Sequence, residues 1–253
     1  MSTVDRRTET LRALQPYIER ARSFSGWTFD DVRKAPLDPD PPWDYQAVAR
    51  EHVAVARDVL DMGTGGGEVL SQIVAGRDAR VVATEHWHVN APIARDRLRP
   101  LGGHVVRANN LRLPFRDAAF DLVLNRHEEL DPADVVRVLR GGGAIVTQQV
   151  GHNQWEEQRR FFPRRTVWPD HFVTYRRGFE AAGMRVEAMR HEQRVAYATL
   201  GDVVFMMLIT PWEVPDFDPD AEIDALLAME DALGGPQGIV FTEVRYLIAA
   251  SGR

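Results

Sequence analysis

Residues 59–70 read Val-Leu-Asp-Met-Gly-Thr-Gly-Gly-Gly-Glu-Val-Leu. A short apolar run ends at Asp61, four glycines follow within five positions, and an apolar helical pattern then begins. This order predicts a strand, a tight turn and a helix. Glycine suits the turn because the backbone must bend sharply and approach a ligand closely, which a Cβ atom would block. The first N–H groups of the following helix are free to face that ligand.

The position of the acid separates this turn from a dinucleotide-binding fingerprint, which has the order G-x-G-x-x-G. Here Asp61 stands just before the first glycine, where a carboxylate would repel a pyrophosphate and attract a cationic amino-acid cofactor. The arrangement resembles motif I of the class I S-adenosylmethionine (SAM) methyltransferases. In that family the acid and the glycine loop surround the amino-acid and ribose parts of SAM. The resemblance implies cofactor contacts from Asp61, Gly63, Thr64, Gly65 and Gly67.

Strands and helices are expected to alternate on both sides of this turn, which predicts an α/β fold with a parallel sheet. We expect strands at 58–61, 80–85, 104–108, 120–125, 144–148, 184–190 and 239–249, with residues 141–143 as a turn. The resemblance implies a Rossmann-like, doubly wound, mostly parallel sheet of seven strands with an antiparallel last strand. The chain is read as one domain in three parts: 1–46 as an N-terminal helix and cover segment, 47–151 as the SAM-binding core, and 152–253 as a lid, a helical insertion and the completion of the sheet.

Two further segments indicate an adenosine ligand. Glu85 ends the second expected strand, where an acid can accept hydrogen bonds from both ribose hydroxyls, although a nicotinamide enzyme would use it in the same way. Residues 107–123 resemble the Leu-Pro-Phe and Phe-Asp-Leu-Val signature of the methyltransferases, in which an acid six residues before the Phe contacts adenine. Asn109 occupies that position and Asn110 stands beside it; an Asn carbonyl can still accept from the adenine amino group, so either side chain can serve.

A narrower resemblance, to a bacterial subgroup of these enzymes with mostly unassigned substrates, is carried by residues 42–45, 61–68, 83–85, 125–128, 147–151 and 211–217. It leaves the methyl acceptor open. Three further cofactor contacts are expected from position: His86 and Asn125 lie at the carboxyl ends of expected strands, where ligands bind in parallel sheets, and Tyr45 lies just ahead of the first strand, where it can cover the cofactor.

The residues that follow the fourth and fifth strands are the candidates for substrate chemistry. Methyl transfer is an in-line displacement in which alignment contributes much of the acceleration, and a base is needed only when the acceptor must lose a proton. His127 is a candidate base and Glu128 a second one; alternatively, both orient their loop through backbone hydrogen bonds. Arg126 either recognises a carboxylate or phosphate of the substrate or pairs with a neighbouring acid.

Three more side chains are placed in the expected substrate pocket. Gln148 and Gln149 point to opposite faces of their strand, so we expect one of them to line it. Trp212, bracketed by two prolines, walls the acceptor pocket or closes the core. No metal site is expected, because His86 and His88 stand only two residues apart and no H-E-x-x-H motif occurs.

The amino-acid composition and net charge limit the classes of function that this protein can have. The 253 residues have a net charge of −6 and no cysteine, which excludes disulfides and thiolate catalysis. No apolar run approaches the roughly 18–20 residues that span a bilayer, and the polar N-terminus is unlike a signal peptide, so we expect a cytoplasmic protein without membrane contact. The acidic balance disfavours nucleic acid, although arginine pairs at 159–160, 164–165 and 176–177 leave a local basic patch possible.

The leading hypothesis is a SAM-dependent methyltransferase that acts on an O or N acceptor of a small molecule and releases S-adenosylhomocysteine. An rRNA or tRNA methyltransferase and a SAM-binding protein without catalysis are the alternatives. A nicotinamide dehydrogenase is disfavoured by Asp61 and by the Leu-Pro-Phe segment. The oligomeric state stays open.

Overall fold

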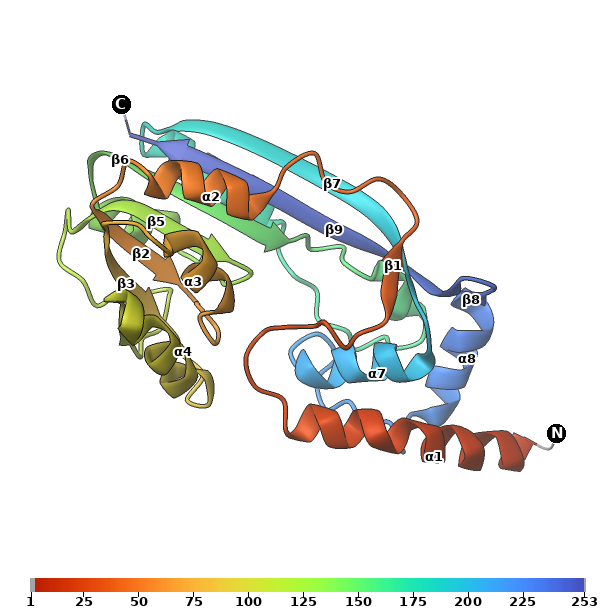
Figure 1. Cartoon of the computed structure of the whole chain (residues 1–253). Helices are drawn as coiled ribbons and strands as arrows, with labels where there is room; N and C mark the ends of the chain where they lie inside the picture. Colours follow the sequence, from red (N-terminus) through yellow and green to blue (C-terminus); the bar gives the residue numbers. More distant parts are fainter. Residues whose placement is uncertain (1–2, 253) are drawn as a thin grey trace.

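A single mixed sheet organises the molecule (Figure 1). The computed structural model describes residues 3–252, with side chains from residue 6 onward. Within this range the strands are β1 (Lys34–Pro36), β2 (Asp58–Met62), β3 (Arg80–Thr84), β4 (His104–Val106), β5 (Phe120–Arg126), β6 (Leu139–Val150), β7 (Arg185–Tyr197), β8 (Gly234–Gly235) and β9 (Gly238–Ser251). They are ordered β1-β7-β9-β6-β5-β2-β3-β4, and β8 pairs with β9. Strands β2 to β6 pair in parallel, whereas β9 lies antiparallel between β6 and β7.

Helices cover both faces of the parallel part of the sheet, as the doubly wound prediction required. The helices of the core are α2 (Tyr45–Val53), α3 (Glu68–Val74), α4 (Asn90–Leu98, continued by a 3₁₀ turn at Arg99–Leu101), α5 (Pro132–Val138) and α6 (His171–Ala181). One face buries Leu124, Val146 and Leu247 against α2 and α3. The alternate strand residues, among them Val123 and Ile145, pack against α5 and α6.

A third apolar cluster joins the N-terminal helix to the helical insertion between β7 and β9. It packs α1 (Thr3–Arg22) against α7 (Leu200–Ile209) and α8 (Ile223–Leu233), under the 3₁₀ turn at Glu156–Arg160 and the far ends of β7 and β9. Helices α7 and α8 lie in the chain between β7 and β9, so the expected helical insertion is present. Arg33 and Asp202 tie the segment after α1 to α7: the Asp202 carboxylate accepts from the Arg33 backbone N–H and guanidinium, both at 3.2 Å.

The structure corrects the predicted strand list in two ways. The short strands β1 and β8 were not expected; both pair with extensions of the long β7–β9 hairpin beyond the core. Residues 141–143 do not form a turn before a strand but lie inside β6, at a shift in its register with β5. A Cβ atom on Gly143 would lie 3.0 Å from the Asp121 carbonyl oxygen, so the irregularity needs glycine there. No helix among residues 3–252 is long and apolar enough to cross a membrane.

Candidate functional site

The glycine loop connects the carboxyl end of β2 to the first turn of α3. Gly63, Gly65 and Gly67 have φ angles of +67°, +62° and +77°, in the left-handed region that glycine adopts without strain. Close neighbours also exclude larger residues: a Cβ atom on Gly63 would lie 2.6 Å from Cβ of Glu128, and one on Gly65 would lie 2.5 Å from Cδ1 of Trp27. The loop is therefore fixed by backbone conformation and by contacts from distant segments.

Three carboxyl groups surround the loop, each following a different parallel strand. Asp61 ends β2, Glu85 follows β3 and Glu128 follows β5. Glu85 accepts the backbone N–H groups of Gly65 and Trp87, both at 2.7 Å. Burial raises the pKa of all three carboxyls; that of Asp61 rises to about 7, with Glu85 raising it further and Thr64 and Arg126 opposing. A cation bound here would be attracted by these closely spaced carboxyls, none of which forms an ion pair within the described residues.

The two candidate adenine residues differ in their surroundings. Asn110 is buried, and its Oδ1 accepts the Thr84 hydroxyl at 2.6 Å, beside the end of β3. Asn109 is exposed and its Oδ1 accepts the Leu111 N–H at 2.8 Å, closing the local turn. Asn110 is therefore buried near the glycine loop, whereas Asn109 is exposed to solvent. His86, next to Glu85, is also exposed.

Tyr45 lies against the acid that ends β2. It is the first residue of α2, is buried, and lies close to the Asp61 carboxyl and the Asn125 backbone. Burial raises its pKa well above the ordinary value, so the hydroxyl stays protonated at neutral pH. A neutral hydroxyl beside Asp61 can donate a hydrogen bond without adding charge.

Gln149 and Asn125 form a buried network rather than part of a cavity wall. The Gln149 amide nitrogen donates to Asn125 Oδ1, to the Thr147 hydroxyl at 2.9 Å and to the Glu128 carbonyl at 2.7 Å. This network holds the loop after β5 against β6. The Asn125 Nδ2 atom has no partner within the described part of the chain and is buried.

His127 turns the chain away from β5. Its φ angle is +63°, which histidine tolerates better than most residues, and its N–H donates to the Gln148 carbonyl at 2.8 Å. The side chain can be reached by water, yet protein surrounds it. That burial, together with Arg126, Arg245 and Lys34, lowers the His127 pKa well below its ordinary value. The imidazole is neutral at neutral pH, which is the form that can accept a proton.

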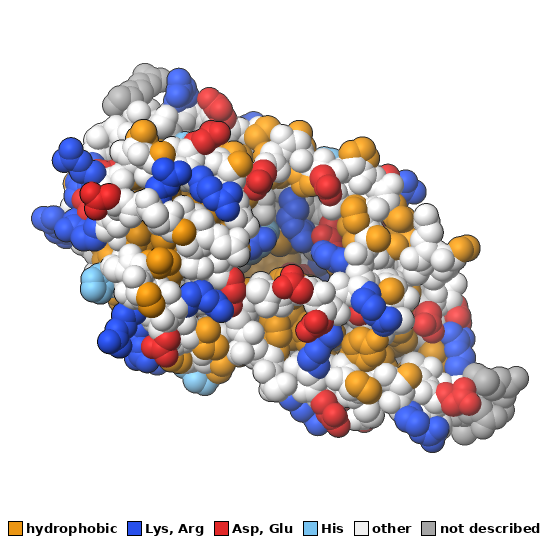
Figure 2. Space-filling model, viewed as in Figure 1, with side chains coloured by type: hydrophobic (Ala, Val, Ile, Leu, Met, Phe, Trp, Pro, Cys, Tyr) orange, Lys and Arg blue, Asp and Glu red, His pale blue; other side chains and the backbone are white. Residues whose placement is uncertain are grey.

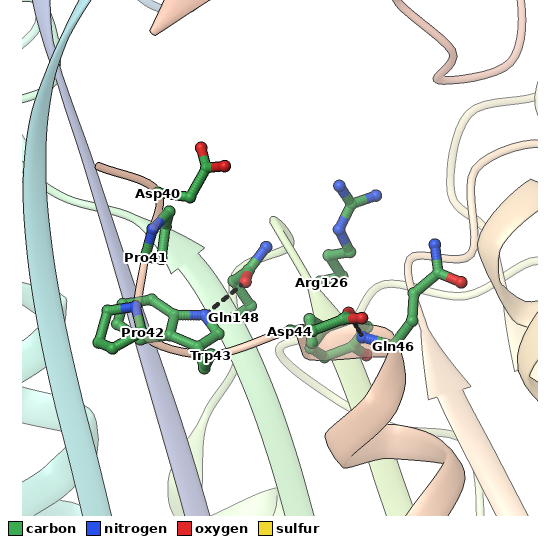
Figure 3. A pocket seen from close by; sticks show the side chains of 9 residues that line it. Asp40, Pro41, Pro42, Trp43, Asp44, Gln46, Arg126 and Gln148 are labelled. Atoms are coloured by element: carbon green, nitrogen blue, oxygen red, sulfur yellow. Dashed lines mark hydrogen bonds between the residues drawn. The ribbon is translucent and has the colours of Figure 1, made fainter. Parts of the chain in front are cut away.

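A cavity of about 540 Å³ opens next to Tyr45 (Figure 3). It is lined by residues 40–46 together with Arg126 of β5 and Gln148 of β6. The Trp43 indole N–H donates to the Gln148 side-chain oxygen at 2.8 Å. In the space-filling view a hollow lies between the parallel part of the sheet and β1, with Lys or Arg side chains inside it (Figure 2). The structure thus brings Arg126, Gln148 and Tyr45 together.

The segment after α1 covers the glycine loop, and sequence reasoning missed which of its residues reaches the loop. Trp27 rests on Gly65, the ring of Trp212 lies 6.2 Å from that of Trp27, and the Gly26 N–H donates to Asn90 Oδ1 at 2.7 Å. The aromatic residues of 24–46 marked a cover segment, but without periodicity nothing indicated which of them reaches the loop. No group of three or more potential metal ligands occurs in the residues that the structure describes.

Comparison with known proteins matches residues 60–147 to the family described as "Methyltransferase domain". The matched segment runs from within β2, through the glycine loop, β3, β4 and β5, to within β6. A search of curated proteins gives no match to this chain.

Solved structures share the fold of this chain over most of its length. A functionally unknown protein from Deinococcus radiodurans R1 matches with a TM-score of 0.63 and 16% identity, covering 93% of this chain and 98% of the other. The YcgJ protein from Bacillus subtilis matches with a TM-score of 0.60 and 16% identity, covering 83% and 98%. A proposed methyltransferase from Bacillus halodurans C-125 matches with a TM-score of 0.59 and 17% identity, covering 81% and 97%. At these identities the likeness concerns the fold alone.

Proposed function

We propose that the chain is a SAM-dependent methyltransferase that transfers a methyl group to an oxygen or nitrogen atom of a small molecule. The observation that carries this proposal is the glycine loop surrounded by the carboxyls of Asp61, Glu85 and Glu128. SAM carries two cationic groups, an ammonium and a sulfonium, besides its carboxylate and nucleoside, and buried acids around a glycine-rich loop suit it. The methyltransferase domain at 60–147 supports the same conclusion.

Each loop residue has a role in this proposal. Asp61 would accept hydrogen bonds from the amino group of SAM, and Asn110 from its adenine amino group. Each Glu85 oxygen accepts one backbone N–H and keeps a lone pair for a ribose hydroxyl. Bound SAM supplies an electrophilic methyl group. The neutral His127 imidazole can take a proton from a hydroxyl or amine acceptor, with Glu128 as the second candidate.

The arginine pairs do not favour an RNA substrate. Arg159 pairs with Glu156 at 2.6 Å, the buried Arg165 with Glu213 at 2.9 Å, and Arg164 with Glu222. The charges of these arginines are largely neutralised by ion pairs within the protein, so less positive charge is available to bind the phosphate groups of RNA. A small-molecule acceptor is therefore the better proposal.

Calorimetric titration tests the cofactor proposal. The full chain is titrated with SAM, with S-adenosylhomocysteine and with NAD, and the SAM pair should bind while NAD should not. Asp61→Ala should weaken SAM binding by about tenfold or more, because a charged hydrogen bond is lost. Asp96→Ala is the matched control, since Asp96 is exposed on α4 and should leave binding unchanged. Binding of NAD in place of SAM, or equal binding by Asp61→Ala, would refute the proposal.

Transfer of the methyl group separates an enzyme from a protein that only holds SAM. Chain that binds SAM is incubated with methyl-labelled SAM and panels of hydroxyl and amine compounds, with bulk RNA as a further acceptor. Label in a small molecule supports the proposal, whereas label only in RNA would move the acceptor to nucleic acid.

A further inference from the structure

Arg126 is a charged side chain without a protein partner at the wall of the cavity. It is the last residue of β5, and its guanidinium projects into the open space of the cavity beside Gln148 (Figure 3). Within the described residues its guanidinium forms no ion pair or hydrogen bond, although the Asp61 carboxyl and the Tyr45 hydroxyl lie near enough to interact with it electrostatically. Burial lowers the Arg126 pKa, yet a guanidinium stays protonated at any physiological pH. The alternative that Arg126 pairs with a neighbouring acid is thus not realised in this structure.

Gln148 is oriented so that its amide nitrogen is free to donate. Its oxygen accepts the Trp43 indole N–H at 2.8 Å, and an indole N–H can only donate, so the oxygen must be the atom that faces Trp43. The NH₂ group then points toward the same open space as the Arg126 guanidinium (Figure 3). The wall formed by β5 and β6 therefore offers donors and no acceptor at this point.

The sheet register continues this positive surface beyond the cavity. Arg126 pairs with Gln148, and Val150, two residues along β6, pairs with Arg245 of β9. Alternate residues share a face, so Arg126, Gln148 and Arg245 lie on the same side of the sheet. Further along, Glu243 lies between two cations, accepting from Lys34 at 2.8 Å and from Arg245 at 3.0 Å. Asp61 pairs with Leu124 of β5 and so lies on the same face. The three cations Arg126, Arg245 and Lys34 still outnumber the two acids Glu243 and Asp61 there.

The acids at the cavity do not cancel that charge. Asp44 is occupied as the N-cap of α2, where it accepts the N–H groups of Gln46 and Ala47. Asp40 is exposed to solvent at the rim, and no ion pair joins it to Arg126 in the described chain. Water screens an exposed carboxylate, whereas a ligand that reached Arg126 would displace water from the guanidinium.

We propose that Arg126 and Gln148 bind an anionic group, a carboxylate or a phosphate, that is carried by the methyl acceptor. This inference rests on the proposed methyltransferase function. The guanidinium offers two parallel N–H groups that fit either anion, and the Gln148 amide adds a third donor. The cavity has the size of a small-molecule site. Tyr45 lines it and also lies beside Asp61, so the acceptor would sit next to the acid-lined loop.

Ligand-observed NMR on the full chain, with S-adenosylhomocysteine present, tests the anion site. The probes are benzoate and phenyl phosphate, with benzamide as a neutral compound of similar shape. We expect at least one anion to bind the unaltered protein more tightly than benzamide; the preferred anion then distinguishes a carboxylate from a phosphate.

Two variants at the site and one control complete the test. Arg126→Gln should weaken binding of the preferred anion by about tenfold or more. Gln148→Glu keeps an acceptor for Trp43 but replaces the donor with a negative charge, and should weaken binding as much. Arg177→Gln removes an exposed charge from α6, which covers the opposite face of the sheet, and should change nothing. The proposal fails if benzamide binds as well as the anions, or if Arg126→Gln binds them like the unaltered protein.

Calorimetry with S-adenosylhomocysteine on the same samples keeps the two proposals separate. If S-adenosylhomocysteine binds and the binding of the anions does not depend on Arg126, the proposed anion site is wrong and the cofactor proposal stands. If the anions bind through Arg126 and neither SAM nor S-adenosylhomocysteine binds, the cofactor proposal fails while the anion site stands.

Discussion

Asp61 shows how a single residue can be unfavourable for folding and useful for binding. Its carboxyl is buried with Glu85 nearby, and its pKa is raised to about 7. The folded protein therefore holds a proton on Asp61 between about pH 4 and pH 7, where the unfolded chain does not. The raised pKa makes Asp61 contribute stability below its unfolded pKa, and that contribution is lost as the pH rises to about 7.

This linkage predicts a pH-dependent effect of Asp61→Asn on the free energy of unfolding. The amide of the Asp61→Asn variant never ionises, so the variant keeps the stability that the unaltered protein loses when the Asp61 carboxyl ionises. Relative to the unaltered protein, the variant should gain up to about 1.4 kcal/mol per pH unit between pH 5 and 7, and nothing more above pH 8. Urea unfolding at several pH values measures the difference. Asp96→Asn should show no such trend, and a pH-independent difference for Asp61→Asn would contradict the assigned pKa.

At the scale of elements, the glycine loop is held from outside by the segment that follows α1. Trp27 packs on Gly65, and Arg97 of α4 donates to the Gly66 carbonyl and pairs with Glu68 at 2.6 Å. The loop conformation therefore depends on two segments that are distant in sequence. A larger residue in the loop would have to displace Trp27.

Two glycine substitutions separate backbone strain from this contact. Gly76 has a φ of +71° and open space around its position, so Gly76→Ala should cost only the left-handed strain, about 1 kcal/mol. Gly65→Ala has the same strain and also meets Trp27, which should add roughly 1–3 kcal/mol. Chemical denaturation of both variants measures the costs.

The double variant Trp27→Ala with Gly65→Ala is the control. Relative to Trp27→Ala alone, the added Gly65→Ala change should cost no more than Gly76→Ala does, because the indole is gone. An undiminished cost would mean that Trp27 is not the obstacle.

The elements themselves were mostly predictable, because each has a local signal. The strands β2, β3 and β5 follow from apolar runs, and their observed bounds agree with the expected ones within one residue. The position of residues 141–143 inside β6 was not predictable, since glycines mark a bulge and a turn alike. Trp27 on the loop and the unpaired state of Arg126 depend on contacts across the fold, and no local pattern reports them.

At the scale of the whole molecule, the cover of the site depends on a cluster away from the sheet core. Helix α1 packs on α7 and α8 through Leu14, Ile18 and their neighbours, and the segment after α1 then runs to Gly65. Helix α1 thus meets α7 and α8 in one apolar cluster, and Trp27, whose ring contacts Phe24 at the border of that cluster, is positioned by it.

We predict that Leu14→Ala lowers the free energy of unfolding by about 2–5 kcal/mol, because Leu14 is 2% exposed in this cluster. Chemical denaturation gives the value, and fluorescence of the Trp27 region should change with it. Val55→Ala, at a side chain that is 87% exposed, should have almost no effect. A neutral result for Leu14→Ala would mean that α1 is not docked on α7 and α8.

The place of β9 between β6 and β7 has a consequence for biosynthesis. The ribosome makes the glycine loop, Asp61, Glu85 and Arg126 well before Gly238–Ser251, the strand that closes the sheet. A nascent chain can therefore order its nucleoside side while β6 still has an open edge and Arg245 does not yet exist. Arg245 joins the face that carries Arg126 only when β9 has been made, and until then the exposed edge of β6 is the part of the protein that a chaperone would need to shield.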